Sequence, residues 1–319
     1  MSKKEEAEYE EYENLKNSKF KQQKLPGWRP VPSMARTVTI FICFGIVFVC
    51  LGVLILLFSN NIVEFSERYD NNPNCNSTID GTCEIVINIT KKMNKNILVY
   101  YQLDGFYQNH RRYVQSRSEA QLRGENISLE KMRESQDCDP VVTNEEMNVI
   151  DTNPLHNNKL KPNETAIPCG LMAKSFFNDT FQFILLSEGN KTIEVNDANI
   201  ARKSDKDKFK NIDPSLQWMD MTNEHFIVWM RPAPLPNFRK LYGRILEDID
   251  ADPQIVVEIS NNYNVSSFNG AKHIILTTVN NFGGKNYFLS IGYMILGGIC
   301  LILSIIFIIG FKIHAKKEK

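Results

Sequence analysis

VTIFICFGIVFVCLGVLILLF, residues Val38–Phe58, is a run of 21 residues without a charged side chain. A second run, Phe288–Phe311, has 24 uncharged residues. Because a helix rises about 1.5 Å per residue and a hydrocarbon core is about 30 Å thick, either run can cross a bilayer. A buried core helix is the alternative for both runs. A cleaved signal peptide fits the first run poorly, because 37 residues precede it and Ser59-Asn60-Asn61 follows it.

The charges beside these runs predict the topology. Basic residues gather on the outer flanks, in the tails 1–37 and 312–319, whereas only Arg68 and Lys285 lie near the inner ends. The positive-inside rule therefore places both tails in the cytosol. Those close to the runs are Lys21, Lys24, Arg29, Arg36, Lys312, Lys316, Lys317 and Lys319. Residues 59–287 then form an extracytosolic domain that is long enough for its own hydrophobic core.

Asn-x-Ser/Thr sequons agree with this topology, because all seven lie between the two apolar runs. Such sequons accept N-linked glycans in extracytosolic segments. The expected glycosylation sites are Asn76, Asn88, Asn126, Asn163, Asn178, Asn190 and Asn264.

Four of the seven cysteines also lie between the runs, at Cys75, Cys83, Cys138 and Cys169. An even number in an oxidising compartment indicates two disulfides, for which three pairings exist. We favour Cys75–Cys83, which closes a short loop containing the turn dipeptide Asp80-Gly81, together with Cys138–Cys169. The alternative, a metal site, is disfavoured because the sequence has no C-x-x-C motif or paired histidines near these cysteines.

The segment between the runs alternates polar and apolar residues over several short stretches, which is typical of strands. We expect a β-rich α+β domain with antiparallel, sandwich-like sheets. Expected strands are 84–90, 97–103, 180–186, 226–230, 254–260 and 273–279. Expected helices are a basic helix within 105–124 and a short amphipathic helix over 237–247.

Signatures of catalysis are missing from the sequence. Gly283-Gly284-Lys285-Asn286 cannot complete a phosphate-binding loop, because Val279 stands where a glycine is needed. An EF-hand starting at Asp248 fails at Pro253 and Ile259. With no HExxH or G-x-S-x-G motif either, we expect a non-enzymatic protein without metal or cofactor. Its 37 basic and 37 acidic residues disfavour a nucleic-acid binder.

The cytosolic segment Phe20–Pro32 reads FKQQKLPGWRPVP. Its prolines prevent a continuous helix, and Leu25 and Trp28 are large apolar groups in a polar tail. The segment is either an anchor at the lipid headgroups or a docking segment for a cytosolic surface, and both roles are compatible.

Five long motifs occur along the chain: FKQQKLPGWRP before the first run, YYQLDGFYQNHRRYVQSR (100–117), PCGLMAKSFFNDTF (168–181), FIVWMRPAPLPNFRKLYGRI (226–245) and GGKNYFLSIGY (283–293). In sequence and in order, these motifs resemble the cell cycle control protein 50 family. The resemblance implies a non-catalytic β-subunit of a type IV P-type ATPase, a phospholipid flippase. Such a subunit supports folding of the pump, exit from the endoplasmic reticulum, and movement of aminophospholipids from the exoplasmic to the cytosolic leaflet.

The resemblance also implies a heterodimer with the ATPase α-subunit, in contact with membrane lipids. The expected location is that of an integral membrane protein of the endoplasmic reticulum to Golgi, endosome or plasma membrane. The resemblance suggests contact residues at the cytosolic face and on the extracytosolic domain. These are Phe20, Leu25, Trp28, Arg29, Tyr107, His110, Arg111, Arg112, Arg231, Arg239, Tyr242 and Arg244. Two other classes of protein share this organisation: a two-span ligand-gated channel subunit and a stand-alone glycosylated receptor ectodomain.

Overall fold

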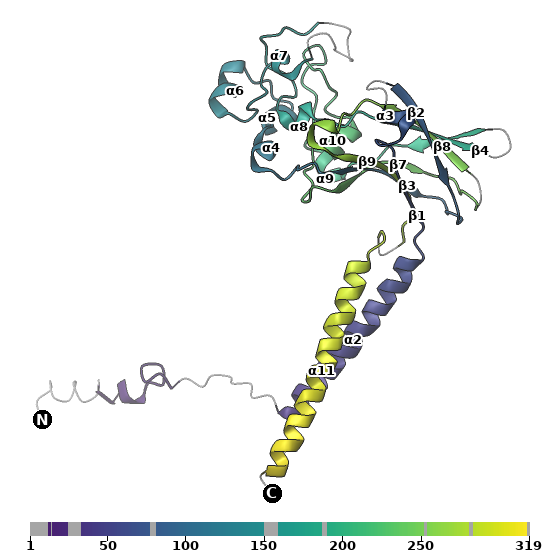
Figure 1. Ribbon diagram of the computed structural model, residues 1–319. Helices are drawn as coiled ribbons and strands as arrows, with labels where there is room; N and C mark the ends of the chain where they lie inside the picture. The colour runs from purple at the N-terminus through teal and green to yellow at the C-terminus, as the bar shows by residue number, and fades with distance from the viewer. Residues whose placement is uncertain are drawn as a thin grey trace, which may run out of the picture. The chain divides into compact units, whose positions relative to one another are not determined.

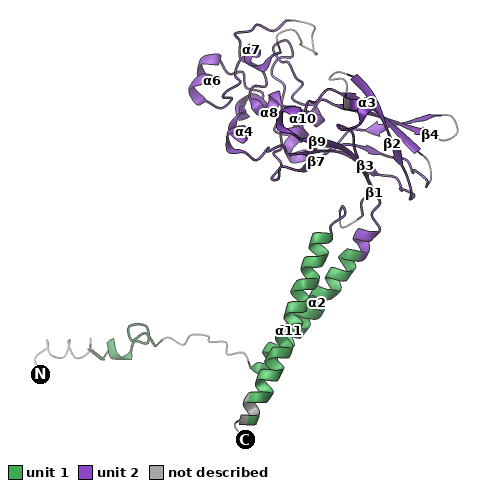
Figure 2. Ribbon diagram, in the orientation of Figure 1, with its two compact units in different colours: residues 1–56, 287–319 green, residues 57–286 purple. Residues whose placement is uncertain are grey.

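The computed structural model describes residues 12–13, 15–24, 33–76, 81–149, 159–186, 190–251, 254–280 and 283–317 (Figure 1). Two compact units divide the chain. A helical unit comprises 1–56 with 287–319, and a β-sheet unit comprises 57–286 (Figure 2).

Two long helices carry the apolar runs, α2 (Met34–Asn60) and α11 (Tyr287–Lys317). Both are long and apolar enough to cross a membrane, and each extends beyond the run from which it was predicted. Glycines let their backbones approach: a Cβ on Gly45 would lie 2.7 Å from the Leu301 side chain, and one on Gly297 would lie 2.8 Å from the Gly45 carbonyl oxygen. Small residues serve the same purpose in membrane helix pairs generally.

Two antiparallel sheets build the β-sheet unit, as predicted. One has five strands in the order β1-β9-β3-β7-β6, and the other has four in the order β2-β8-β4-β5. The five strands are β1 (Glu64–Arg68), β9 (Ala271–Thr277), β3 (Ile97–Asp104), β7 (Phe238–Ile245) and β6 (Val195–Asn196). The four strands are β2 (Gly81–Asn88), β8 (Gln254–Asn261), β4 (Thr180–Leu186) and β5 (Lys191–Ile193).

Period-two burial explains why these segments are strands. In β2, Cys83, Ile85 and Ile87 are buried while the residues between them are exposed. Since successive side chains of a strand point to opposite faces, one face of β2 enters the core. Inward residues of both sheets belong to one continuous hydrophobic cluster, which makes the unit sandwich-like.

Short helices lie between the strands. They are α3 (Pro73–Asn76), α4 (Arg111–Gln115), α5 (Glu119–Leu122), α6 (Leu129–Ser135), α7 (Asn144–Met147), α8 (Leu171–Lys174), α9 (Lys203–Lys206), α10 (Glu224–Trp229) and the 3-10 turn η1 (Ser266–Phe268). Figure 1 shows α4 to α8 gathered at one side of the sheets.

The structure corrects three local predictions. The expected strand 226–230 is instead the end of helix α10 with its C-cap Met230. Asn223 caps the first turn of this helix, and Phe226, Ile227 and Trp229 are buried. Residues 237–247 contain strand β7, not a helix, and β7 pairs with both β3 and β6. The basic helix expected within 105–124 is broken into α4 and α5, with Ser118 as a new N-cap.

Both disulfides lie in the β-sheet unit. They join Cys75 to Cys83 and Cys138 to Cys169, the pairing favoured from the sequence. The first links α3 to β2, and the second links the loop after α6 to the segment before α8. Asp80 of the expected turn lies outside the described residues.

A buried ion pair connects the two sheets. Lys272 of β9 places its Nζ 2.7 Å from Oδ2 of Asp179, the residue before β4. The same oxygen accepts a 2.6 Å hydrogen bond from the Tyr69 hydroxyl, and the other accepts from the backbone N–H groups of Asn262 and Tyr263. Both partner side chains are almost wholly buried, so this pair is shielded from water.

Candidate partner-contact surface

Two segments distant in sequence lie side by side in the β-sheet unit. Gln108 Oε1 accepts a 3.0 Å hydrogen bond from the Ala233 N–H, and Asn109 Nδ2 donates to the Pro234 carbonyl at 2.8 Å. The Phe106 N–H donates to the Pro236 carbonyl at 3.0 Å. These bonds fix the proline-rich loop 232–236 against the 105–110 segment.

Two cations anchor the start of this loop at the C-terminus of α10. The Nζ of Lys240, on β7, donates to the carbonyl oxygens of Val228, Trp229 and Arg231. Arg117 Nη1 donates to the Met230 carbonyl at 3.1 Å. Cations suit the unsatisfied carbonyls at a helix C-terminus. Burial, with repulsion from Arg231, lowers the pKa of Lys240 to about 7.

Large and basic side chains protrude from the two fixed segments and from the start of α4, which follows the first of them. Tyr107 is 62% exposed and Leu235 is 64% exposed. His110, Arg111 and Arg112 are also exposed, and their side chains form no hydrogen bond or ion pair with any described residue. We call these five residues the 107–112/235 surface. Tyrosine and arginine are enriched in protein-binding hot spots, and Leu235 adds an exposed aliphatic group beside them.

The other contact candidates in the β-sheet unit are engaged within the chain. Arg231 pairs with Asp205 at 3.3 Å, and Arg239 pairs with Glu64 at 3.0 Å. Both line a cavity of about 280 Å³ beside the loop. Arg244 donates to the Asn199 carbonyl, and the half-buried Tyr242 accepts a hydrogen bond from the Phe181 N–H.

In the N-terminal segment before α2, Phe20 is 74% exposed. Leu25, Trp28 and Arg29 lie outside the described residues. Among the sequons, Asn76 ends α3, and the remaining six asparagines are exposed: Asn88, Asn126, Asn163, Asn178, Asn190 and Asn264.

Metal-binding chemistry is not assembled in the described ranges, which contain no group of three His, Cys, Asp or Glu able to hold an ion.

Sequence reasoning missed Leu235 and Lys240. Leu235 stands between two prolines, and a large apolar residue in a proline-rich loop was an available signal. Lys240 gave no signal, because an isolated lysine is ordinarily exposed and its burial depends on the strand register of β7.

The chain is similar in sequence to a known protein family over almost its whole length. Residues 6–317 match the LEM3 (ligand-effect modulator 3) family / CDC50 family. ALA-interacting subunit 3 of Arabidopsis thaliana is 38% identical, over 95% of this chain and 87% of its own length. Cell cycle control protein 50A of Mus musculus is 33% identical, over 92% of this chain and 88% of its own. With both apolar helices and the whole β-sheet unit inside the matched range, the chain belongs to the LEM3/CDC50 family.

Proposed function

We propose that this protein is the accessory subunit of a type IV P-type ATPase and that it supports flipping of aminophospholipids to the cytosolic leaflet. The Arabidopsis relative is named as an interacting subunit, which describes an accessory role. The observation that carries the proposal is the 107–112/235 surface: exposed anchor groups on a backbone held in place by internal hydrogen bonds.

Each part of the chain then has a location relative to the membrane and the pump. Residues 38–58 and 288–311 are the membrane-embedded parts of α2 and α11, and the tails 1–37 and 312–319 are cytosolic. Residues 59–287 are extracytosolic and glycosylated, and they contact the short extracytosolic loops of the pump through the 107–112/235 surface. The segment 20–32 contacts the pump at the cytosolic face.

Binding supplies the mechanism. A subunit that binds only the folded pump stabilises it by mass action, which favours exit from the endoplasmic reticulum. Different affinities for two intermediates of the transport cycle would shift the populations of those intermediates. The accessory chain then changes transport without performing chemistry itself.

A mild-detergent pull-down through a C-terminal tag, followed by mass spectrometry, tests the assignment. We expect a type IV P-type ATPase in stoichiometric amount, with ATP hydrolysis stimulated by an aminophospholipid. Recovery of this chain alone, as a homo-oligomer, would overturn the proposal and favour a channel subunit.

A matched pair of variants tests the surface. Arg111→Ala with Arg112→Ala removes two exposed charges from the 107–112/235 surface and should lower ATPase recovery by about tenfold or more, in line with loss of hot-spot residues. Arg123→Ala with Lys131→Ala removes two exposed charges elsewhere and should leave recovery unchanged. Equal recovery with both pairs would exclude this surface from the interface.

A further inference from the structure

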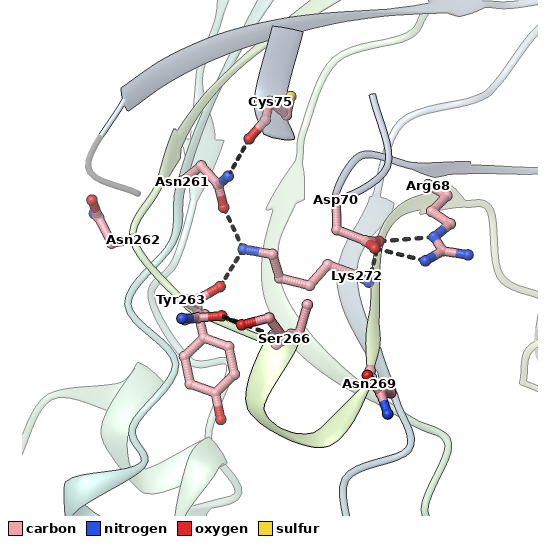
Figure 3. A pocket seen from close by; sticks show the side chains of 12 residues that line it. Arg68, Asp70, Cys75, Asn261, Asn262, Tyr263, Ser266, Asn269 and Lys272 are labelled. Atoms are coloured by element: carbon pink, nitrogen blue, oxygen red, sulfur yellow. Dashed lines mark hydrogen bonds and ion pairs between the residues drawn. The ribbon is translucent and has the colours of Figure 1, made fainter. Parts of the chain in front are cut away.

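A polar pocket lies on the β-sheet unit where β8, η1 and β9 meet the end of β1 (Figure 3). Its volume is about 520 Å³, within the range of about 300–1,000 Å³ that is usual for small-ligand sites. In Figure 3, Asn262 and Asn269 lie on opposite sides of Lys272 and Ser266. The pocket belongs to neither the 107–112/235 surface nor the cavity beside Arg231.

The charges in the pocket are balanced, which decides between ligand classes. Lys272 is paired with Asp179, and its Nζ also donates to the Tyr263 carbonyl at 2.6 Å. Arg68 makes two hydrogen bonds to the Asp70 carboxylate, at 3.0 and 2.7 Å. Burial alone would raise the pKa of Asp70, but the Arg68 guanidinium and the Lys272 N–H outweigh it and lower that pKa. Since each cation already faces a carboxylate, the pocket suits a neutral polar ligand better than a phosphate.

Amide groups around the opening can bind such a ligand. The Asn269 side chain makes no hydrogen bond with any described residue. The Asn262 Nδ2 donates to the Asn178 carbonyl at 3.2 Å. Val265, partly buried, adds an apolar wall. Side-chain amides both donate and accept, which matches the hydroxyl and acetamide groups of an amino sugar.

One glycosylation sequon is part of the pocket wall. Asn264 and Ser266, its first and third residues, both line the pocket. The Asn264 Oδ1 accepts hydrogen bonds from the Ser266 N–H at 2.8 Å and from its hydroxyl at 2.7 Å. The Nδ2, to which a glycan attaches, has no hydrogen bond with a described residue. A sugar on this nitrogen therefore begins inside the pocket lining.

We propose that the pocket binds the first N-acetylglucosamine units of an N-linked glycan on Asn264. Attachment forms a bond between the Asn264 Nδ2 and C1 of the sugar. It breaks the bond between that C1 and the pyrophosphate of the lipid-linked oligosaccharide donor, and the amide loses one proton. The seated sugar covers Arg68 and Asn269 and fixes the loop 261–270.

Site-resolved release by peptide N-glycosidase, on the native full chain in detergent, tests the proposal. The Asn264 glycan should be released at least about tenfold more slowly than the glycan on Asn126, because a seated sugar reacts only from its opened state. After denaturation the two rates should be equal. Equal rates in the native protein, or an unmodified Asn264, would overturn the proposal.

A variant of the pocket shows whether slow release is due to binding of the sugar in the pocket or to poor access of the glycosidase to Asn264. Asn269→Gly suits the positive φ of 51° at this position, and Arg68→Gln removes the guanidinium. Together they should raise the native release rate at Asn264 toward that at Asn126. The control Asn96→Gly changes an exposed asparagine that also has a positive φ, of 73°, but is not part of the pocket. It should leave the release rate at Asn264 unchanged. An unchanged rate in the pocket variant would contradict the proposal.

A second arm distinguishes the chain's own glycan from a sugar of another source. Ser266→Ala removes the sequon and vacates the pocket, so added N,N′-diacetylchitobiose should raise the melting temperature of this variant. It should not raise that of the glycosylated wild type. An equal rise in both, or no rise in the variant, would count against self-occupation.

Discussion

Lys272→Met removes one partner of the buried ion pair while retaining a side chain of similar length. In the variant, the Asp179 carboxylate stays buried and keeps the Tyr69 hydroxyl and the two backbone donors, but it loses the ammonium 2.7 Å away. A carboxylate without its counter-ion in a dry site is costly, and breaking such pairs typically destabilises by about 3–5 kcal/mol. That is a large part of the total stability of a domain, which is about 5–15 kcal/mol.

The expected effect is a lower melting temperature. For a unit of this size, about 1 kcal/mol shifts the melting temperature by roughly 2–4 °C, so Lys272→Met should lower it by about 10 °C. Adding Asp179→Asn removes the unpaired charge and should restore part of the loss, giving a coupling free energy of about 2 kcal/mol in a double-mutant cycle. Tryptophan fluorescence during heating, in detergent, measures both.

Lys92→Met is the matched control. It breaks an ion pair of similar length, with Asp250 at 2.8 Å, but both of its side chains are more than half exposed. Exposed pairs contribute little, so the melting temperature should not change measurably. If Lys272→Met lowers the melting temperature no more than Lys92→Met does, or if the double variant is only additive, the assigned role of the buried pair is wrong.

Three further predictions concern other parts of the chain. Because the folded-state pKa of Lys240 is about 7, below its ordinary 10.5, the unfolded state binds more protons between these values. The unfolding free energy should therefore rise with pH by about 1.4 kcal/mol per unit from this group in that window. In Lys240→Met, denaturant titrations at pH 7.5 and 9.5 should lack this rise, and a slope unchanged from wild type would refute the assignment. Gly297→Leu should disrupt the α2–α11 pair and lower the yield of folded protein in gel filtration, because its Cβ would meet the Gly45 carbonyl at 2.8 Å. Gly298→Leu, with nothing within 4 Å, should be tolerated, and equal yields would argue against the packing. Replacing Cys138 and Cys169 by serine opens a loop of 31 residues and should cost roughly 3.7 kcal/mol by chain entropy, against roughly 2.5 for the 8-residue Cys75–Cys83 loop. Denaturation midpoints in the reverse order would contradict this ranking.

Sequence patterns predicted the elements whose burial is regular. The expected strand 180–186 has the same bounds as β4, and the uncharged runs lie inside α2 and α11. In each case one physical cause dominates: alternating burial over the first four residues of β4, and length with uniform apolarity in the two helices.

Strand β7 shows why other elements were missed. Its pairing with β3 is interrupted by a bulge, so that Val99 faces Gly243 while Tyr100 faces Leu241. The extra residue, Tyr242, shifts the inward phase by one, and buried residues fall at Phe238, Lys240, Gly243 and Ile245. The apolar positions of this stretch therefore have a spacing that resembles a helix. Only the pairing with β3 and β6 shows that it is a strand.

Helix α10 was predicted as a strand because its sequence has the composition of one. FIVWM is rich in β-branched and aromatic residues, as strands are, but most of its side chains are buried and its apolar pattern has no readable period.

The predicted contact residues fall into an exposed group and a group bound within the fold. Exposure singled out Tyr107, Arg111 and Arg112, whereas Arg239 and Arg244 turned out to bind partners across the fold, which no local pattern specifies.

The pairing of β1 with β9 also has a consequence for biosynthesis. Glu64 pairs with Thr277, so the first strand of the sheet must wait until more than 200 further residues have been made. At synthesis rates of about 5–20 residues per second, that delay is roughly 10–40 s. The central strand β3 waits as well, because β7 and β9 on its two sides both come late in the chain. During this interval the nascent sheet has open edges that chaperones can bind, and its closure reports that the chain has been completed almost to its second apolar helix.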